Sequence, residues 1–308
     1  MASPDFDFDT ATHAERHAAL ALVLCEVAPA ARGSLVEAVA AQPIEKLGAL
    51  EGLIVARRQG KVVAAAWAQP QVGNAVTMWL PEAIDQHAEN AGPGLLQAAV
   101  ARADSAGVAT CQAVVENAND PRIAALESAG FEAIAELTYL SRTITTPPAR
   151  NVAPGMSFAV VDKSGLLNLV PLIRATYQGS LDCPELGERR SIADTLQGYA
   201  AIGTSGTKGW RTVALDSLVE GVLFVALHHD NEQAELVYMG LTPKARRRGW
   251  GRPIVEEALH IAAGWGAERL ITAADVRNTP ALRVYEQAGF EPWCQRHAYL
   301  RFRPQPAV

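Results

Sequence analysis

The chain of 308 residues lacks the features of a membrane protein, a nucleic-acid-binding protein or a secreted protein. No run of about 18 apolar residues occurs, so a transmembrane helix is not expected. The formal net charge is −6, with 27 basic and 33 acidic residues, which disfavours nucleic acid and anionic membranes as partners. The first residues lack the basic and apolar regions of a secretory signal. We therefore expect a soluble, cytoplasmic protein.

Cysteine is scarce, and the chain shows no metal-binding motif. The four cysteines are Cys25, Cys111, Cys183 and Cys294. They form no Cys-x-x-Cys pair, so the sequence predicts neither a zinc site nor a disulfide framework. The adjacent His228 and His229 follow a strand-like run, in which neighbouring side chains point to opposite faces and cannot easily share one ion. No metal is expected.

An apolar segment followed by a basic, glycine-containing turn is the most informative part of the sequence. Residues 235–241 are rich in β-forming side chains, and Pro243 ends the expected strand because it has no N–H to continue a ladder. Apolar residues then recur at helical spacing through 254–262. The sequence therefore predicts a strand, a turn over 244–251 and a helix.

This turn is suited to an anion. Gly249 and Gly251 stand where the helix begins, and glycine allows a ligand to approach the backbone closely. Free N–H groups and the positive end of the helix dipole at that point favour a group such as a pyrophosphate. Three neighbouring arginines, Arg246, Arg247 and Arg248, add positive charge. The alternative is a basic surface turn with no ligand.

A second strand-like segment at 270–274 and the helix after it complete a known pattern. The two motifs are Arg246-x-x-Gly249-x-Gly251 and Asn278-x-x-Ala281-x-x-x-Tyr285-x-x-x-Gly289-Phe290. Together they resemble the motifs of the GCN5-related N-acetyltransferases (GNAT). One departure is Arg247, which stands where many members of that family have glycine.

The resemblance implies a direct transfer of an acetyl group from acetyl-CoA to an amine in a ternary complex, without a metal. Tyr285 would protonate the departing thiolate, and Glu235 would act as the general base, through water if needed. Backbone N–H groups over 239–241 would stabilise the oxyanion, with a bulge at Gly240. The residues implied in binding acetyl-CoA are Met239, Gly240, Leu241, Arg246, Arg247, Arg248, Gly249, Trp250, Gly251, Arg252, Asn278 and Ala281.

An acidic segment lies between the expected first helices of the C-terminal half, a region that overhangs the acceptor site in the family. Asp182, Glu185 and Glu188 would attract a cationic amine there. A solvated acidic loop is an equally good interpretation. Cys183 lies next to Pro184 without a neighbouring base, so we expect it to pack rather than to act as a nucleophile.

The N-terminal half repeats the C-terminal half. Seven of the fourteen residues in 119–132 are identical to those found 159 positions later. Leu126 occupies the position of Tyr285, so this copy lacks the proton donor. Pairing Gly92-Pro93-Gly94 with Gly249-Trp250-Gly251 puts Glu89 opposite Arg246, and an acidic turn would repel a pyrophosphate.

The sequence thus predicts two tandem acetyltransferase-type domains of the α/β (α+β) class, each with a mixed, mostly antiparallel sheet flanked by helices. A breaker-rich stretch at 143–154 divides them into a degenerate, non-catalytic domain, 1–148, and an acetyl-CoA-binding domain, 149–308. The tandem arrangement also resembles mycothiol synthase, which is the alternative enzyme. A non-catalytic acyl-CoA-binding or interaction module is the alternative without catalysis.

Overall fold

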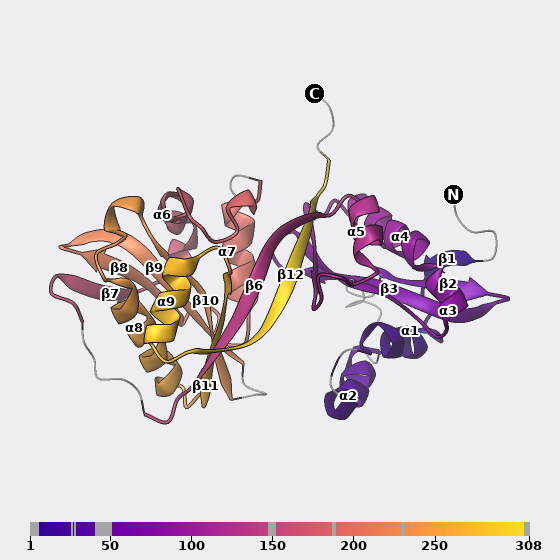
Figure 1. Cartoon of the computed structure of the whole chain (residues 1–308), viewed down its shortest axis with the longest axis horizontal. Helices are drawn as coiled ribbons and strands as arrows, with labels where there is room; N and C mark the ends of the chain where they lie inside the picture. Colours follow the sequence, from indigo (N-terminus) through magenta and orange to yellow (C-terminus); the bar gives the residue numbers. More distant parts are fainter. Residues whose placement is uncertain are drawn as a thin grey trace. The chain divides into compact units, whose positions relative to one another are not determined.

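The computed structural model describes residues 6–25, 27, 29–40, 51–146, 152–186, 189–228 and 232–304. Its packing divides the chain into two compact units (Figure 1). Unit 1 comprises Met1–Ile134 and His297–Val308, and unit 2 comprises Ala135–Arg296. Among the described helices, none is both long and apolar enough to cross a membrane.

Unit 1 is a sheet with helices on both faces. In order across the sheet its strands are β1 (Asp7–Thr10), β2 (Leu53–Arg58), β3 (Lys61–Gln71), β4 (Ala75–Ala83), β5 (Thr110–Val115) and the last part of β12 (Glu291–Phe302). Only the pair β4–β5 is parallel. The helices are α1 (Arg16–Val23), α2 (Pro29–Ala40), α3 (Gln86–Glu89), α4 (Gly92–Ser105) and α5 (Ile123–Ser128). Apolar residues of α4 and α5 pack on one face of the sheet and those of α1 and α2 on the other.

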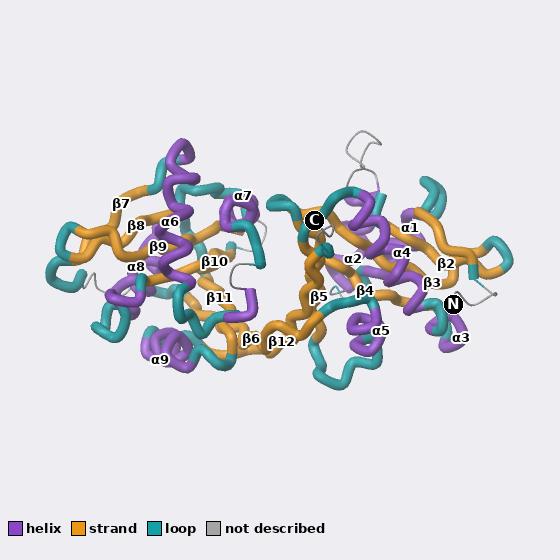
Figure 2. The backbone as a smooth tube through the Cα atoms, turned by 90° about the horizontal axis from the view of Figure 1, so that it is seen from above, coloured by secondary structure: helices purple, strands orange, loops and turns teal. Residues whose placement is uncertain are grey.

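Unit 2 has the same layers. In order across the sheet its strands are β6 (Glu132–Thr143), β11 (Arg269–Asp275), β10 (Gln233–Leu241), β9 (Leu218–His228), β8 (Gly209–Leu215) and β7 (Met156–Val160). Only β10–β11 is parallel. The helical elements are η2 (Lys163–Leu169), α6 (Val170–Tyr177), η3 (Pro184–Leu186), α7 (Ile192–Ala201), η5 (Pro243–Ala245), α8 (Gly251–Gly264) and α9 (Thr279–Gln287). Figure 2 shows the strands between the two helical layers.

Alternating side chains of the strands supply the two cores of unit 2. Leu223 and Val225 pack with the apolar stripe of α8, which matches the helical spacing read from the sequence. On the opposite face, Phe224 stacks on Trp210 with 3.9 Å between ring centroids, beneath α6 and α7. The strand period of two therefore assigns each helix pair its own face.

The repeat predicted from the sequence is visible in the elements themselves. Helices α4 and α8 begin 159 residues apart and end 159 residues apart, as do strands β6 and β12. This alignment places Gly92 opposite Gly251, not opposite Gly249. The residue equivalent to Arg246 is therefore His87 rather than Glu89, because matching the Gly-x-Gly triplets shifted the comparison by two positions.

The two equivalent strands β6 and β12 are exchanged between the units. Leu137–Thr143 of β6 pairs with β11 in unit 2, and His297–Phe302 of β12 pairs with β5 in unit 1. The sequence predicts a division between residues 148 and 149, but the compact units divide elsewhere. The reason is that the last strand of each repeat pairs with a strand of the other unit. Residues 148 and 149 themselves lie outside the described residues.

Candidate functional site

The site is centred on strands β10 and β11 of unit 2, which separate partway along their length. Their parallel register covers only 233–235 of β10, opposite 269–271 of β11. Beyond it, both strands contribute to the wall of a cavity of about 460 Å³, through Leu236–Leu241 and Thr272–Ala274. The cavity therefore exposes a strand edge whose backbone groups have no ladder partner on that side among the described strands.

A bulge lies at the point of separation. The register of β10 with β9 shifts between Leu236 and Tyr238, which places the bulge at Val237 and not at Gly240 as predicted. Gly240 serves a different purpose: a Cβ there would lie 2.6 Å from the Tyr238 hydroxyl and 2.9 Å from Thr176 Cβ. It is required for space rather than for a bulge.

The predicted basic turn also lines the cavity, immediately after η5. Gly249 has a φ of 78° with open space where a Cβ would lie, and Arg247 has a φ of 62°. This left-handed conformation explains why glycine suits position 247 and shows that the chain tolerates an arginine there. A Cβ on Gly251 would lie 3.1 Å from Val284, so this glycine allows α8 to approach α9 closely.

The start of α8 has unsatisfied donors. Trp250 is its N-cap and makes no side-chain cap, and no acidic residue lies in the first turn. The N–H groups of the first turn and the positive end of the helix dipole are therefore suited to an anion, and binding of one stays a prediction. These features fit the pyrophosphate of acetyl-CoA.

Arg246 has a structural role that the sequence did not predict. Its Nε donates to Leu241 O at 3.1 Å, and its two terminal nitrogens donate to Gly179 O at 2.9 Å and Thr176 O at 2.7 Å. The guanidinium thus ties the turn to the end of α6, although it also lines the cavity. Burial lowers the pKa of Arg246, but its ordinary value is so high that the charge remains.

The other predicted arginines divide between the cavity wall and the surface. Arg247 and Arg252 line the cavity, and Arg252 Nε pairs with Glu256 at 2.9 Å. Arg248 is not among the described residues of the wall, and its guanidinium lies 5.1 Å from the ring centroid of Trp250. Its guanidinium thus makes a cation–π contact, and its contact with a phosphate stays a prediction.

Tyr285 points from α9 into the same cavity and is only 5 % exposed. Its hydroxyl shares a hydrogen bond with Thr272, whose own hydroxyl donates to Leu236 O at 3.0 Å. Burial, and to a smaller degree the negative charge of Asp182, raise the pKa of Tyr285. The phenol therefore stays protonated at neutral pH, as a proton donor must.

Asn278 begins α9, and its side chain serves as a cap. Its Oδ1 accepts a hydrogen bond from the Ala281 N–H at 3.3 Å, and its side chain also bonds to Asp182. Asn278 and Ala281 both line the cavity. The family motif thus has a structural role at this helix start in addition to the predicted ligand contact.

Glu235 does not lie among the described residues of the cavity wall, which begins one position later at Leu236. Its carboxylate accepts a hydrogen bond from His228 Nε2 at 2.9 Å. This bond outweighs burial and raises the pKa of His228. As a general base, Glu235 would need a water to reach an acceptor in the cavity.

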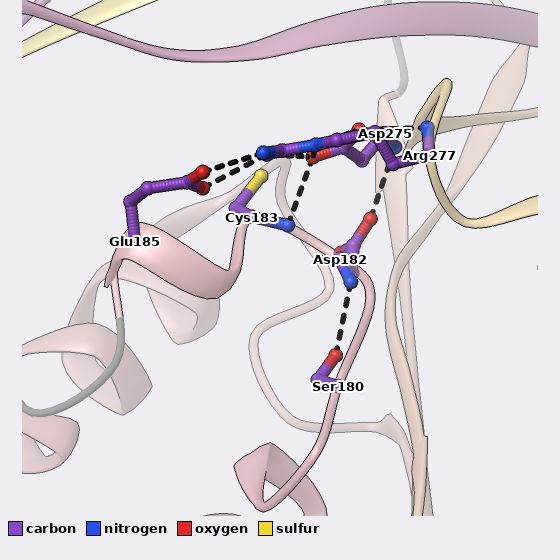
Figure 3. Close-up of polar contacts among 6 residues, drawn as sticks. All are labelled: Ser180, Asp182, Cys183, Glu185, Asp275 and Arg277. Carbon is purple, nitrogen blue, oxygen red and sulfur yellow. Dashed lines mark hydrogen bonds and ion pairs between the residues drawn. The ribbon is translucent and has the colours of Figure 1, made fainter.

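The segment 180–186 is fastened to the end of β11 (Figure 3). Glu185 forms a two-fold ion pair with Arg277, one arm of which measures 2.8 Å, and it is not among the described wall residues. Its charge is thus compensated, contrary to the prediction that it attracts an amine. Asp182 does line the cavity, while Glu188 lies outside the described residues.

The thiol of Cys183 is not activated. Burial raises the pKa of its thiol to about 12, so a thiolate is strongly disfavoured. Its N–H donates to Asp275 Oδ2 at 3.2 Å, and its φ of 44° forms part of the sharp turn.

Sequence reasoning missed several polar wall residues, among them Thr272 and Tyr238. Tyr238 Oη lies 2.8 Å from Thr176 Oγ1, and its ring stacks against Tyr199. The signal was weak because both residues look like ordinary β-formers within their strands. Both residues line the cavity where β10 separates from β11.

Side chains in the equivalent part of unit 1 make contacts within that unit. Leu126, at the position of Tyr285, is fully buried in the core. A Cβ on Gly94 would lie 2.5 Å from the ring of Phe8, so the start of α4 is packed against an aromatic side chain. Glu82 forms an ion pair with Arg122.

Comparison with known proteins agrees with this geometry. Residues 188–290 match the model of the acetyltransferase (GNAT) family. Mycothiol acetyltransferase of Corynebacterium glutamicum (strain R) is 36% identical over 77 residues, which cover 24% of this chain and 26% of that protein. The enzyme of the same name from Gordonia bronchialis is 36% identical over 73 residues, covering 24% of each. The matched part thus spans about a quarter of these relatives.

Solved structures share the fold over the whole chain. A GCN5-related N-acetyltransferase from Sphaerobacter thermophilus has a TM-score of 0.66 at 13% identity, covering 100% of this chain and 99% of that one. A tandem GNAT protein from the clavulanic acid biosynthesis pathway has a TM-score of 0.53 at 16% identity, covering 98% and 100%. At such identities the likeness shows the fold alone. The family match thus covers residues 188–290 of unit 2, and the chain as a whole shares the fold of GCN5-related N-acetyltransferases, including a tandem one.

Proposed function

We propose that unit 2 is an acetyl-CoA-dependent N-acetyltransferase that transfers the acetyl group directly to an amine in a ternary complex. The observation that carries this proposal is the cavity between the parted strands β10 and β11. Its wall combines the uncapped start of α8 with a buried, protonated phenol, Tyr285. An anion site would bind the pyrophosphate of acetyl-CoA, and a proton donor on the same cavity would protonate the thiolate that leaves.

The backbone of the turn holds the donor. N–H groups at Gly251 and Arg252 would bind the pyrophosphate, and Gly249 leaves room for its approach. Arg247 and Arg252 supply positive charge from the cavity wall. Arg246 contributes by fixing the position of the turn, through its three bonds to backbone carbonyl groups.

The free edge of β10 would support the reaction. Backbone N–H groups within Met239–Leu241 line the cavity and would stabilise the negative charge that develops on the thioester oxygen. Tyr285 would donate a proton to the thiolate as the bond between carbon and sulfur breaks. Because burial raises the pKa of Tyr285, the phenol stays protonated at neutral pH and can donate its proton when negative charge develops on the sulfur.

Unit 1 is proposed to be non-catalytic. It lacks a phenol at the position of Tyr285, where Leu126 is buried in the core. The aromatic ring of Phe8 occupies the space beside Gly94 at the start of α4. A second equivalent of acetyl-CoA is therefore not expected.

The relatives favour one specific alternative for the acceptor. Both are named mycothiol acetyltransferase, so transfer in the manner of those enzymes is the second candidate. Since the matched part covers about a quarter of each protein, we propose the broader class, a small-molecule or protein amine.

Acetyl-CoA-dependent release of free thiol, measured against a panel of amines that includes glucosamine and a lysine peptide, tests the proposal. Tyr285→Phe should lower kcat by about 10²-fold, at the low end of general acid catalysis, because water can substitute in part. Acetyl-CoA affinity should not change. The matched control is Tyr299→Phe, which removes a hydroxyl from another buried tyrosine, in unit 1. No thiol release with any amine would refute catalysis and leave an acyl-CoA-binding module.

A further inference from the structure

Two aspartates meet where the segment 180–186 contacts the end of β11, and their surroundings affect them in opposite ways. Asp275 is fully buried, and burial alone would raise its pKa. Hydrogen bonds from Arg277 and from the Cys183 N–H outweigh burial, so the pKa of Asp275 falls below its usual range. Asp275 therefore carries a fixed negative charge at neutral pH.

Asp182 lies directly beside that charge. Its Oδ1 accepts a hydrogen bond from the Asp275 N–H at 3.0 Å, and its own N–H donates to Ser180 Oγ at 3.1 Å (Figure 3). The residue as a whole is exposed, but its carboxyl group faces inward and is partly desolvated. This desolvation, followed by the charge of Asp275, raises the pKa of Asp182. Two neighbouring carboxyl groups with pKa values moved apart are typical of acid–base sites.

The location of Asp182 distinguishes it from the other nearby carboxylates. Among the described residues that line the cavity, Asp182 is the only acidic one. Glu235 is bound to His228 and Glu185 is bound to Arg277, and neither belongs to that wall. Of the three, only Asp182 lines the cavity. One of its carboxyl oxygens, Oδ1, accepts the bond from the Asp275 N–H, and the other does not take part in that bond.

We propose that Asp182, rather than Glu235, takes the proton from the ammonium group of the acceptor amine. This inference rests on the proposed function of unit 2. It assigns a direct contact between the carboxylate and the acceptor nitrogen, and it predicts that the acceptor enters as a cation. An alkyl ammonium group has a pKa of about 10.4, so the amine is mostly protonated at neutral pH. A base must remove one proton before the nitrogen can attack.

Asp182 and Tyr285 together carry the protons that the transfer moves. Asp182 accepts one proton from the ammonium and passes it to solvent, which its exposed position allows. The nitrogen lone pair then attacks the thioester carbon, a carbon–nitrogen bond forms and the carbon–sulfur bond breaks. The leaving thiolate takes a proton from Tyr285, and the second proton lost by nitrogen restores the phenol.

Several groups face Asp182 and shape its pH dependence. Tyr177 comes from α6, Tyr238 from β10 and Tyr285 from α9, and the Asp182 charge contributes to raising the pKa of each, after burial. Asp275 opposes ionisation of Asp182, whereas the cation Arg277 favours it. The tyrosines remain neutral across the working range, so Asp182 should set the acidic limb of activity.

The decisive variant is Asp182→Asn, because an amide oxygen can still accept the bond from the Asp275 N–H but cannot take a proton. The probes are propylamine, which is mostly protonated at neutral pH, and hydroxylamine, which is mostly not. Asp182→Asn should lower kcat/KM for propylamine by about 100-fold and that for hydroxylamine by less than about 10-fold. The acidic limb of the propylamine profile should disappear, and acetyl-CoA affinity should stay unchanged.

Glu185→Gln is the matched control, since it removes an acidic charge from the same segment and weakens the pair with Arg277. Its kcat/KM should change by only a few-fold with either amine. Equal losses in both variants with both amines would show that order in the segment, and not proton transfer, explains the effect, which would overturn the inference. Full activity of Asp182→Asn with propylamine would also overturn it. A wild-type protein that binds acetyl-CoA but acetylates neither amine would refute the base assignment, whereas failure to bind acetyl-CoA would refute the proposed function.

Discussion

Removing β6 should cost unit 2 most of its stability. A chain of residues 149–308, the domain predicted from the sequence, keeps every helix of unit 2 but lacks the strand that pairs with β11. It also keeps the residues of β12 whose partner strand, β5, lies in the deleted part. A chain of residues 132–296 has nearly the same length, retains β6 and ends where unit 2 ends.

The size of the effect follows from the ladder. Register pairs run without interruption from Leu137 with Asp275 to Thr143 with Arg269. At about one backbone hydrogen bond per pair and about 0.5–1.5 kcal/mol for each, the ladder contributes roughly 4–10 kcal/mol. Leu140, which is 3% exposed, and the bond from Arg142 to Ala288 O add to this. Typical unfolding free energies are about 5–15 kcal/mol, so the loss approaches the whole stability of the unit.

Circular dichroism melting and acetyl-CoA binding compare the two truncated chains. Residues 149–308 should show no cooperative transition, or a Tm lower by about 10 °C or more, as a loss of about 4 kcal/mol implies for this size. Residues 132–296 should melt cooperatively and bind acetyl-CoA. Equal Tm values for residues 149–308 and the full chain would refute the exchange of strands as a source of stability.

Three further predictions concern single side chains. Arg247→Gly should be about 1 kcal/mol more stable in urea unfolding than Arg247→Ala, because only glycine adopts the φ of 62° without cost, and equal stabilities would contradict the left-handed turn. The pKa of Glu15 falls from 4.5 to about 2 through its bonds to Arg57, so Glu15→Gln should lose about 3 kcal/mol at pH 7. The stability that ionised Glu15 contributes is present above its pKa in the unfolded chain and is lost as the pH falls through its pKa in the folded chain. A stability deficit of Glu15→Gln that persists at pH 2 would therefore exclude the ionised carboxylate as its cause. Because the pKa of Asp182 is raised, its ionised form costs stability above that pKa, and Asp182→Asn should melt no lower than wild type at pH 7.

Local patterns predicted the parts of the site that depend on neighbouring residues in the sequence. The strand before Pro243, the turn with Gly249 and the helix start at Gly251 are all present, because proline, glycine and helical periodicity act over a few residues. The motif likewise placed Tyr285 on the cavity, since the spacing from Asn278 fixes which face of α9 carries it.

Long-range pairings decided what the sequence could not. Arg246 and Glu185 were read by charge alone, but the first is bound to carbonyl groups of α6 and the loop after it, and the second to Arg277. The exchange of β6 and β12 could not be predicted either, because two equivalent strands of a repeat have similar patterns and fit either sheet. Only their packing partners distinguish the two arrangements.

Titration calorimetry with acetyl-CoA tests the central claim, that unit 2 alone binds the acyl donor at the turn before α8. Wild-type protein should bind with a stoichiometry near one. Gly249→Glu should abolish binding, because it adds a side chain and a negative charge where a pyrophosphate would lie. Gly266→Glu is a closely matched control: its φ of 77° resembles the 78° of Gly249, and both positions have open space around an added Cβ. Retained binding in Gly266→Glu and loss in Gly249→Glu is the predicted result, whereas two equivalent sites or unchanged binding by Gly249→Glu would contradict the account.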